Sequence, residues 1–182
     1  MTISEEAFAA LESEVRLLRD RQEILDCINL YGRGLDRLDA GLIRNAYHPD
    51  AIDQHGPFLG GVDEFVPFAI EIEGSFVATH HGITSHNCEI DGDEAHAESY
   101  VYFFVVQPGG QMLGSGYGRY IDRLERRDGK WAISVRRLVM DCSFEIAKSG
   151  WLGPAWDEIR AHRDPTDMSY ERPLQPPRGA SL

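Results

Sequence analysis

Hydrophobic residues recur at spacings of three, four and seven along the N-terminal part of the chain. This spacing predicts one long helix over residues 4–39, because side chains so spaced share one helix face. Its apolar positions are Phe8, Leu11, Val15, Leu18, Ile24, Leu25, Ile28 and Leu35. Before about Arg19 the stripe is narrow, as expected for a helix that leans on a partner subunit or on the outside of the domain.

Two glycines interrupt the end of this helix. Gly32 and Gly34 each cost about 1 kcal/mol relative to alanine in a helix interior, so we expect another element or a ligand to approach closely there. A second, short helix is expected over residues 38–47 and a short strand over 51–55. Asp63 is typical of an N-cap for a third helix over residues 64–76.

The hydrophobic period changes to two from Thr79 onward. Four strands are predicted, over residues 83–90, 95–106, 111–123 and 131–144, with a turn signal between each pair. Successive strands with tight turns favour an antiparallel meander. Helices followed by such a sheet predict an α+β fold, with one domain over residues 1–150 and a C-terminal extension over 151–182 that is partly helical and then irregular.

Composition narrows the classes of protein. The 182 residues contain 42% hydrophobic residues, enough for a sizeable core, and a net charge of −12 that argues against nucleic acid and anionic membrane surfaces. No apolar run reaches the length of a membrane span, and the polar start lacks the features of a signal peptide. Cys27, Cys88 and Cys142 are widely spaced, as expected for free thiols, so we expect a cytoplasmic location.

Asp36 and the pair His80–His81 are the candidate catalytic groups. A carboxylate that binds one imidazole nitrogen leaves the other nitrogen basic, which creates a general base without a metal. Neighbours in a strand point to opposite faces, so only one of the two histidines can enter a pocket.

A metal centre is the alternative that these side chains suggest. Two histidines and a carboxylate can form a facial triad, and the chain offers Asp53, His55, His80, His81 and His86. The set is scattered and its convergence is not established by spacing. We therefore expect no catalytic metal and no cofactor.

Both faces of the strand over residues 95–106 are apolar. Tyr100, Tyr102 and Phe104 share one face, and Val101, Phe103 and Val105 share the other. Such a strand is covered on both sides, and one set is expected to line a pocket. Gly114, Gly116 and Gly118 share a face of the next strand, which predicts close packing or a sharp bend.

The order of elements and four motifs resemble the SnoaL-like branch of the nuclear-transport-factor-2-like superfamily, which includes scytalone dehydratase, hexachlorocyclohexane dehydrochlorinase and the bile acid dehydratases. The motifs are Tyr31 five residues before Asp36, the run Tyr47-His48-Pro49-Asp50-Ala51, His81 ten residues before Asp91-Gly92-Asp93, and the run from Gly118 to Trp131. The resemblance covers about residues 10–145. It implies a cone in which a strongly curved, mixed or antiparallel sheet wraps around the N-terminal helices and encloses an apolar pocket. It also implies a metal-free Asp–His dyad and a homotrimer, with a homodimer as second choice.

Position within the family assigns individual residues. Asp36 falls on the aspartate of the dyad and His81 on its histidine, while Tyr31 falls on a tyrosine of the bile acid dehydratases. Five helical steps place Tyr31 about 140° around the axis from Asp36, so a regular helix does not present both to one pocket unless Gly32 or Gly34 distorts it. Met140 stands where the bile acid enzymes carry an arginine, and the nearest basic residues are Arg136 and Arg137.

The resemblance implies a cofactor-independent lyase that acts on a hydrophobic, ring-bearing alcohol or halide. His81 is expected to remove a proton, and Tyr31 or Tyr47 to bind the departing group, which is water, halide or formaldehyde. The residues expected to bind substrate are Tyr47, Phe68, Tyr102, Phe104, Tyr117, Arg136 and Met140. The alternatives are a ketosteroid-type isomerase and a non-catalytic small-molecule-binding or assembly module of the same fold.

The extension carries three large apolar side chains, Trp151, Leu152 and Trp156. Exposed, each forfeits on the order of 2 kcal/mol of transfer free energy. We expect them to bury against a neighbouring subunit or at the mouth of the cone.

Overall fold

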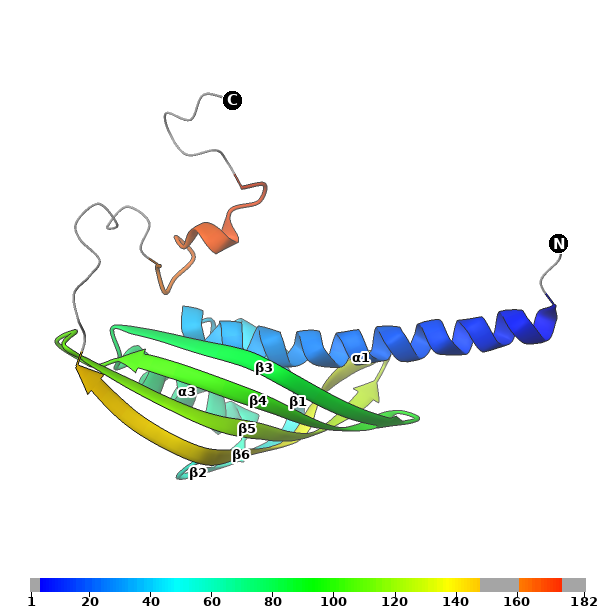
Figure 1. The fold of residues 1–182 in the computed structure, drawn as a ribbon, viewed down its shortest axis with the longest axis horizontal. Helices are drawn as coiled ribbons and strands as arrows, with labels where there is room; N and C mark the ends of the chain where they lie inside the picture. The colour runs from blue at the N-terminus through cyan, green and yellow to red at the C-terminus, as the bar shows by residue number, and fades with distance from the viewer. Residues whose placement is uncertain (1–3, 148–160, 175–182) are drawn as a thin grey trace.

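The computed structural model describes residues 4–147 and 161–174, and its helices and strands follow the predicted order (Figure 1). The helices are α1 (Glu5–Arg37), α2 (Ala40–Asn45), α3 (Val62–Gly74) and the 3-10 turn η2 (Met168–Tyr170). The strands are β1 (Tyr47–His55), β2 (Phe58–Gly61), β3 (Ala78–Asp91), β4 (Glu94–Val106), β5 (Met112–Arg127) and β6 (Lys130–Ala147).

The six strands form one mixed sheet in the order β2-β1-β6-β5-β4-β3. Strands β3 to β6 pair antiparallel with their neighbours in sequence, which confirms the predicted meander. Strand β1 adds to the far side of β6 in parallel, and β2 closes that edge antiparallel to β1. The mixed sheet therefore arises because the segment between α2 and α3 pairs with the last strand.

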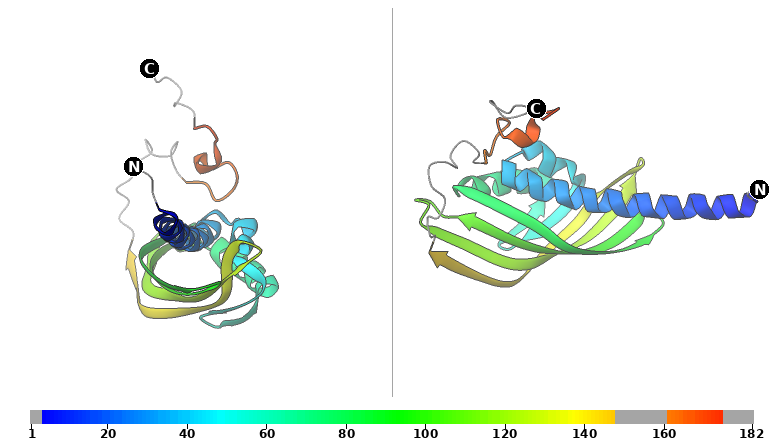
Figure 2. Two further views of the ribbon diagram at one scale, coloured as in Figure 1. Left: turned by 90° about the vertical axis from the view of Figure 1, so that its right-hand side faces the viewer. Right: turned by 45° about the horizontal axis from the view of Figure 1, so that its top comes forward.

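The sheet curls into an open ring with α1 lying along its opening (Figure 2). Register shifts at Tyr117/Gly118 and Arg123/Leu124 interrupt the β5–β6 ladder, and such irregularities increase local twist. Ile24, Ile28 and Leu35 of α1 pack in one buried cluster with Phe65 of α3 and with residues of the sheet. These features confirm the predicted α+β cone.

Both glycines of α1 lie at close contacts, as expected. A Cβ on Gly32 would lie 3.5 Å from Cβ of His81, and one on Gly34 would lie 2.8 Å from both Cγ1 and the backbone nitrogen of Ile43. The helix stays continuous through both positions and ends at Leu38, whose φ of 52° is left-handed. Gly34 therefore admits α2 without distortion of the helix, whereas at Gly32 a Cβ would make an ordinary van der Waals contact with β3.

The first turns of α1 project beyond the sheet (Figure 1). Phe8, Leu11 and Val15 are 54%, 52% and 56% exposed, so the narrow stripe has no cover within the described part of this chain. A partner subunit on this stripe stays a prediction.

Several boundaries differ from the sequence predictions. Strand β1 begins at Tyr47 instead of residue 51, β3 begins at Ala78 instead of 83, and β2 was not predicted. Helix α3 is capped by Gly61 without a side-chain hydrogen bond, so Asp63 is inside the helix and is not its N-cap. The missed strand segments have weak hydrophobic patterns. They form strands because pairing with β1, β4 and β6 supplies hydrogen-bond partners for their backbone N–H and C=O groups.

Two further predictions concern membrane spans and the C-terminal extension. Among the described residues, no helix combines the length and apolar character needed to cross a membrane. Trp151, Leu152, Trp156 and the helix expected near them lie outside the described residues.

The contact at Gly34 generates a stability prediction. We expect Gly34→Ala to lower the free energy of unfolding by about 1–3 kcal/mol, because the new methyl group meets backbone and side-chain atoms of Ile43. Gly74→Ala is the matched control, since a Cβ there meets nothing within 4 Å and alanine favours the helix. Urea denaturation of both variants measures the difference, and equal stability would contradict the packing described.

Candidate functional site

Asp36 and His81 form a hydrogen-bonded pair where α1 ends and β3 begins. Oδ1 of Asp36 lies 2.8 Å from Nδ1 of His81, and Oδ2 accepts the backbone N–H of His81 at 3.0 Å. The hydroxyl of Thr79 donates to Oδ1 at 3.3 Å. Three interactions therefore hold the carboxylate, and Nε2 of His81 remains available for other chemistry.

The strand alternation separates His81 from His80. His81 shares the inner face with Phe103, whose ring stacks on the imidazole with centroids 6.0 Å apart. His80 is exposed on the other face and stacks on Phe104 at 5.2 Å. The structure therefore pairs Asp36 with His81 and keeps His80 outside.

Glu73, near the C-terminal end of α3, faces the free side of the imidazole. Its Oε1 lies 4.0 Å from Nε2 of His81, and the two side chains are 13% and 7% exposed. Burial raises the pKa of Glu73 above its ordinary value, although the charges of His81 and Arg163 oppose this shift. Glu73 was not predicted, but its position at helical spacing from Phe65 and Ala69 signals a carboxyl group on the buried face.

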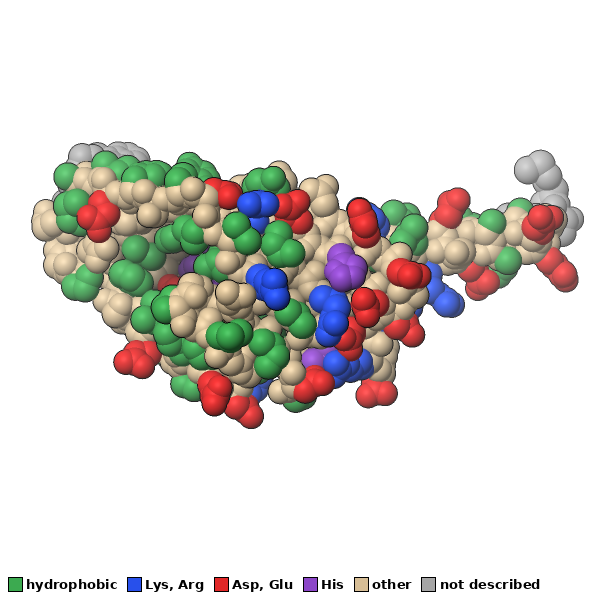
Figure 3. Space-filling view, turned by 90° about the horizontal axis from the view of Figure 1, so that it is seen from below, with side chains coloured by type: hydrophobic (Ala, Val, Ile, Leu, Met, Phe, Trp, Pro, Cys, Tyr) green, Lys and Arg blue, Asp and Glu red, His purple; other side chains and the backbone are tan. Residues whose placement is uncertain are grey.

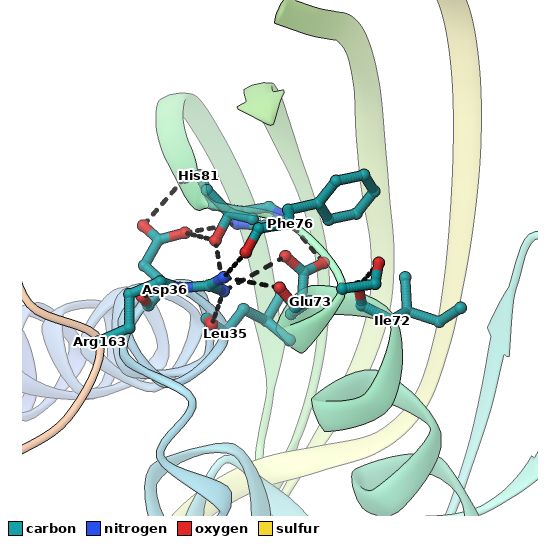
Figure 4. Close-up of polar contacts among 9 residues, drawn as sticks. Leu35, Asp36, Ile72, Glu73, Phe76, His81 and Arg163 are labelled. Atoms are coloured by element: carbon teal, nitrogen blue, oxygen red, sulfur yellow. Dashed lines mark hydrogen bonds and ion pairs between the residues drawn. The ribbon is translucent and has the colours of Figure 1, made fainter. Parts of the chain in front are cut away.

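Arg163 connects the C-terminal segment to this site (Figure 4). Its guanidinium donates to the carbonyls of Leu35 and Asp36 on α1, at 3.3 and 3.1 Å. It also donates to the carbonyls of Glu73, in the last turn of α3, and Phe76, just after α3, at 2.6 and 3.0 Å. It also donates to the Thr79 hydroxyl at 2.9 Å. Carbonyls at helix C-termini attract cations, so this one side chain ties two helix ends to the start of β3.

Further contacts hold the same segment on α1. Tyr170 donates its hydroxyl to Asp39 at 3.1 Å, and the guanidinium of Arg33 lies 4.8 Å from the Tyr170 ring centre. Nothing in the sequence signals these contacts, because residues 161–174 lack a hydrophobic period.

A second polar cluster lies in the core around Arg136. Its guanidinium binds Asp122 through two hydrogen bonds of 2.7 Å, with both side chains fully buried. The rings of Tyr31 and Tyr120 lie 4.2 and 4.1 Å from Cζ of Arg136, at the distance of cation–π contacts. Arg136 is thus held by a carboxylate and by aromatic faces.

Tyr47, Asp53 and His55 complete this second cluster. The Tyr47 hydroxyl donates to Oδ2 of Asp53 at 2.5 Å, and Nδ1 of His55 lies 3.4 Å from Oδ1. Within the described part of the chain, the Tyr31 hydroxyl, Oδ1 of Asp53, Nδ1 of His55 and Nη1 of Arg136 are buried without a hydrogen-bond partner. Unpaired buried groups are costly, so this cluster is suited to a polar group of a bound molecule.

Tyr31 is brought to the second cluster and forms no hydrogen bond with Asp36 or His81. Burial raises the pKa of Tyr31 and Tyr120 well above the ordinary value, and the charge of Glu73 adds to both shifts. Glu73 is therefore coupled electrostatically to His81 on one side and to the tyrosines on the other. Both phenols remain protonated, so each can donate a hydrogen bond.

Other residues expected to bind substrate lie elsewhere. Tyr102, Phe104 and Tyr117 are on the outer face of the sheet, opposite to His81, because strand faces alternate; Phe103 takes the inner place instead. Phe68 packs on Phe58 against the core, and Met140 is 42% exposed beside Gly118. We therefore leave the three outer aromatics out of the candidate site.

Figure 3 shows a hollow bordered by hydrophobic side chains, with histidine and acidic side chains visible inside it. A separate cleft of about 600 Å³ opens beside Arg44, Arg127 and Lys130. Arg44 binds Asp63 and Arg127 binds Asp50 there, so two of its cations are already paired. Tyr47 also lines this cleft, whereas Asp36, His81 and Glu73 do not.

No set of three histidine, cysteine or acidic side chains in residues 4–147 and 161–174 converges to hold a metal ion. Four of the five candidate triad residues are divided between the inner dyad, the Arg136 cluster and the outer face. His86 instead contacts the Ser99 hydroxyl at 2.9 Å.

Comparisons with known proteins support the fold. A family model described as a SnoaL-like domain matches residues 16–137. Hexachlorocyclohexane dehydrochlorinase LinA-type3 from Novosphingobium barchaimii is 19% identical, with 78% of this chain and 99% of that chain covered and a TM-score of 0.69. A protein from Novosphingobium aromaticivorans, provisionally named a scytalone dehydratase, is 20% identical with 78% and 99% covered and a TM-score of 0.66.

A protein of unknown function from Nostoc punctiforme, described as having a cystatin-like fold, is 22% identical, with 67% of this chain and 91% of that chain covered and a TM-score of 0.58. No curated protein sequence matches the chain. At these identities the solved structures show the shared fold.

The contacts of Arg163 generate a second prediction. We expect Arg163→Ala to lower the free energy of local opening of residues 161–174 by about 1–3 kcal/mol, because partly buried carbonyls lose their donor. Native-state hydrogen exchange measures this opening. Arg16→Ala, an exposed position on the projecting part of α1, is the control and should change nothing. Unchanged exchange in both variants would show that Arg163 does not hold the segment.

Proposed function

Because this chain belongs to the SnoaL-like domain family and pairs Asp36 with His81, we propose that it is a cofactor-independent lyase. The reaction is an elimination from a hydrophobic, ring-bearing alcohol or halide, such as a steroid-like or aromatic compound. The observation that carries this proposal is the 2.8 Å contact between Oδ1 of Asp36 and Nδ1 of His81. Because Asp36 binds Nδ1, the other imidazole nitrogen, Nε2, is available to act as a base.

The dyad performs the first chemical step. Asp36 accepts the Nδ1–H of His81, which fixes the tautomer with a basic Nε2. Nε2 then removes a proton from carbon, or from a phenol or alcohol, and the carboxylate stabilises the imidazolium that forms. Phe103 stacks on the imidazole and limits its rotation, so the base keeps its direction toward the interior.

The Arg136 cluster is the proposed binding site for the polar end of the substrate. The Tyr31 hydroxyl is buried without a partner and stays protonated, so it can donate a hydrogen bond to a departing or developing oxyanion. Tyr47 already donates to Asp53, which makes Tyr31 the better placed donor. Arg136 contributes positive charge behind the two tyrosine rings.

An isomerase is the second candidate, and one observation favours it. A buried carboxyl group with a raised pKa and a protonated tyrosine are the groups that stabilise an enolate in ketosteroid-type chemistry. Product analysis separates the two, because isomerisation conserves the mass of the substrate and elimination does not. A protein that binds such compounds and converts none would be a binding or assembly module.

Relatives named as dehydrochlorinase and scytalone dehydratase support elimination of halide or water; loss of formaldehyde from a hydroxymethyl group uses the same base. We also propose a homotrimer, as the family resemblance implies, and a cytoplasmic location, which the free cysteines favour.

The dyad leads to a direct mutational prediction. With a substrate found by screening, we expect His81→Ala to abolish turnover and Asp36→Asn to lower kcat by a factor on the order of 10⁴, because asparagine fails to fix the tautomer. His80→Ala is the matched control, since His80 lies on the outer face, and it should keep wild-type activity. Near-normal activity of a folded Asp36→Asn variant would refute the dyad.

A chelation experiment tests the absence of a metal requirement. Activity should survive dialysis against EDTA, because the proposed step needs only the imidazole and two hydrogen-bonding groups. Loss of activity that zinc, iron or manganese restores would assign the histidines to a metal centre instead.

A further inference from the structure

The dyad mechanism leaves one buried acid without a role. Glu73 lies in the interior, its Oε2 has no hydrogen-bond partner within the described residues, and its Oε1 lies 4.0 Å from Nε2 of His81. That distance is too long for a hydrogen bond, so a substrate hydroxyl can contact Oε1 while Nε2 faces the adjacent carbon. Residue 73 therefore borders the point where elimination takes place.

Four ionisable groups surround this point. Asp36 comes from α1, His81 from β3, Glu73 from α3 and Arg163 from the C-terminal segment. Nη2 of Arg163 lies 4.0 Å from Oε2 of Glu73, and its positive charge balances the negative charge of the Asp36 carboxylate beside His81, so the set is neutral when His81 and Glu73 together hold one proton. Low dielectric surroundings favour the neutral set over one with net charge.

Desolvation also favours the protonated form of Glu73. Burial raises its pKa, and the nearby charge of Asp36 raises it further, while His81, Arg163 and Thr79 lower it. A carboxyl group whose pKa is raised by burial can serve as a general acid.

We propose that Glu73 is a further catalytic residue, which donates a proton to the hydroxyl group that leaves and shares one proton with His81. This inference rests on the proposed lyase function. It also narrows the substrate class to alcohols, because a departing hydroxyl group needs a proton and a departing halide does not.

The proton balance of one turnover closes within this pair. Nε2 of His81 takes the proton from carbon, and the C–H electron pair forms the new carbon–carbon double bond. The carbon–oxygen bond breaks with its electrons on oxygen, and the Glu73 proton converts the hydroxyl group into water. The imidazolium then returns its proton to Oε1, 4.0 Å away, through the water molecule that the reaction releases, which restores both groups without another acid, base or oxidant.

A pair of probes with different leaving groups tests this role. The first is a cyclic β-hydroxy ketone fused to an aromatic ring, and the second is its β-chloro analogue. We expect Glu73→Gln to lower kcat/KM for the hydroxy ketone by about 10²–10⁴, and for the chloro ketone by less than about 10-fold. Glu71→Gln, an exposed position on the same helix, is the control and should leave both values unchanged.

The pH profile adds a readout that a structural role would not change. Wild-type activity on the hydroxy ketone should fall at high pH as the pair loses its proton, and this fall should be absent in Glu73→Gln. An infrared spectrum of the wild-type protein without ligand should show a protonated carboxyl band at neutral pH that Glu73→Gln removes and Glu71→Gln keeps.

The outcomes separate this inference from the function on which it rests. Equal losses for both probes, or an infrared spectrum without that band, would overturn the role of Glu73. An inactive His81→Ala variant would still support the lyase function in that case. If the wild-type protein converts neither probe nor any screened alcohol or halide, the lyase function falls, and the role of Glu73 falls with it.

Discussion

Burial of the Asp36 carboxylate is the constraint on which the site depends. A carboxylate removed from water is stable only when other groups replace its hydration, and here one imidazole, one backbone N–H and one hydroxyl do so. All three come from residues 79–81, so the charge can be buried only if the end of α1 lies directly against the start of β3. Gly32 lies at this junction, where a Cβ would come to 3.5 Å from Cβ of His81. The same contacts that stabilise the helix end therefore orient the catalytic base.

The interior contains two polar centres with opposite electrostatic character. Around Arg136 the charged groups are held in place, since the guanidinium and the Asp122 carboxylate bind through two hydrogen bonds and both are fully buried. Around His81 and Glu73 the arrangement is looser, because Nε2 of His81 and Oε1 of Glu73 lie 4.0 Å apart without a hydrogen bond between them. A fixed centre suits binding and orientation, and a variable centre suits proton transfer. Tyr31 interacts with both centres: its ring packs on the guanidinium of Arg136, and the charge of Glu73 raises its pKa.

The sequence predicts those features that follow from periodicity. The long helix and the four-stranded meander depend on patterns within one segment, and strand alternation already required that only one of His80 and His81 enter the interior. It does not predict β2, which is short and exists through its pairing with β1. The prediction placed Tyr102 and Phe104 in the pocket, but periodicity does not decide which face of β4 turns inward, and the structure turns Phe103 toward His81 instead. Arg163 was invisible because its partners are backbone carbonyls from two distant helices.

The position of Arg163 makes the C-terminal segment part of the electrostatics of the site. Its positive charge opposes the effect of burial on Glu73 and so lowers the pKa that burial alone would give. Without that charge the carboxyl group would hold its proton more tightly, and a proton held too tightly is a poor one to donate. Burial also lowers the pKa of Arg163, and the carboxylates of Glu73 and Asp36 oppose that shift in turn. The C-terminal segment therefore lowers the pKa of Glu73 as well as holding two helix ends together. The strength of the proposed proton donor thus depends on a residue about ninety positions away in the chain.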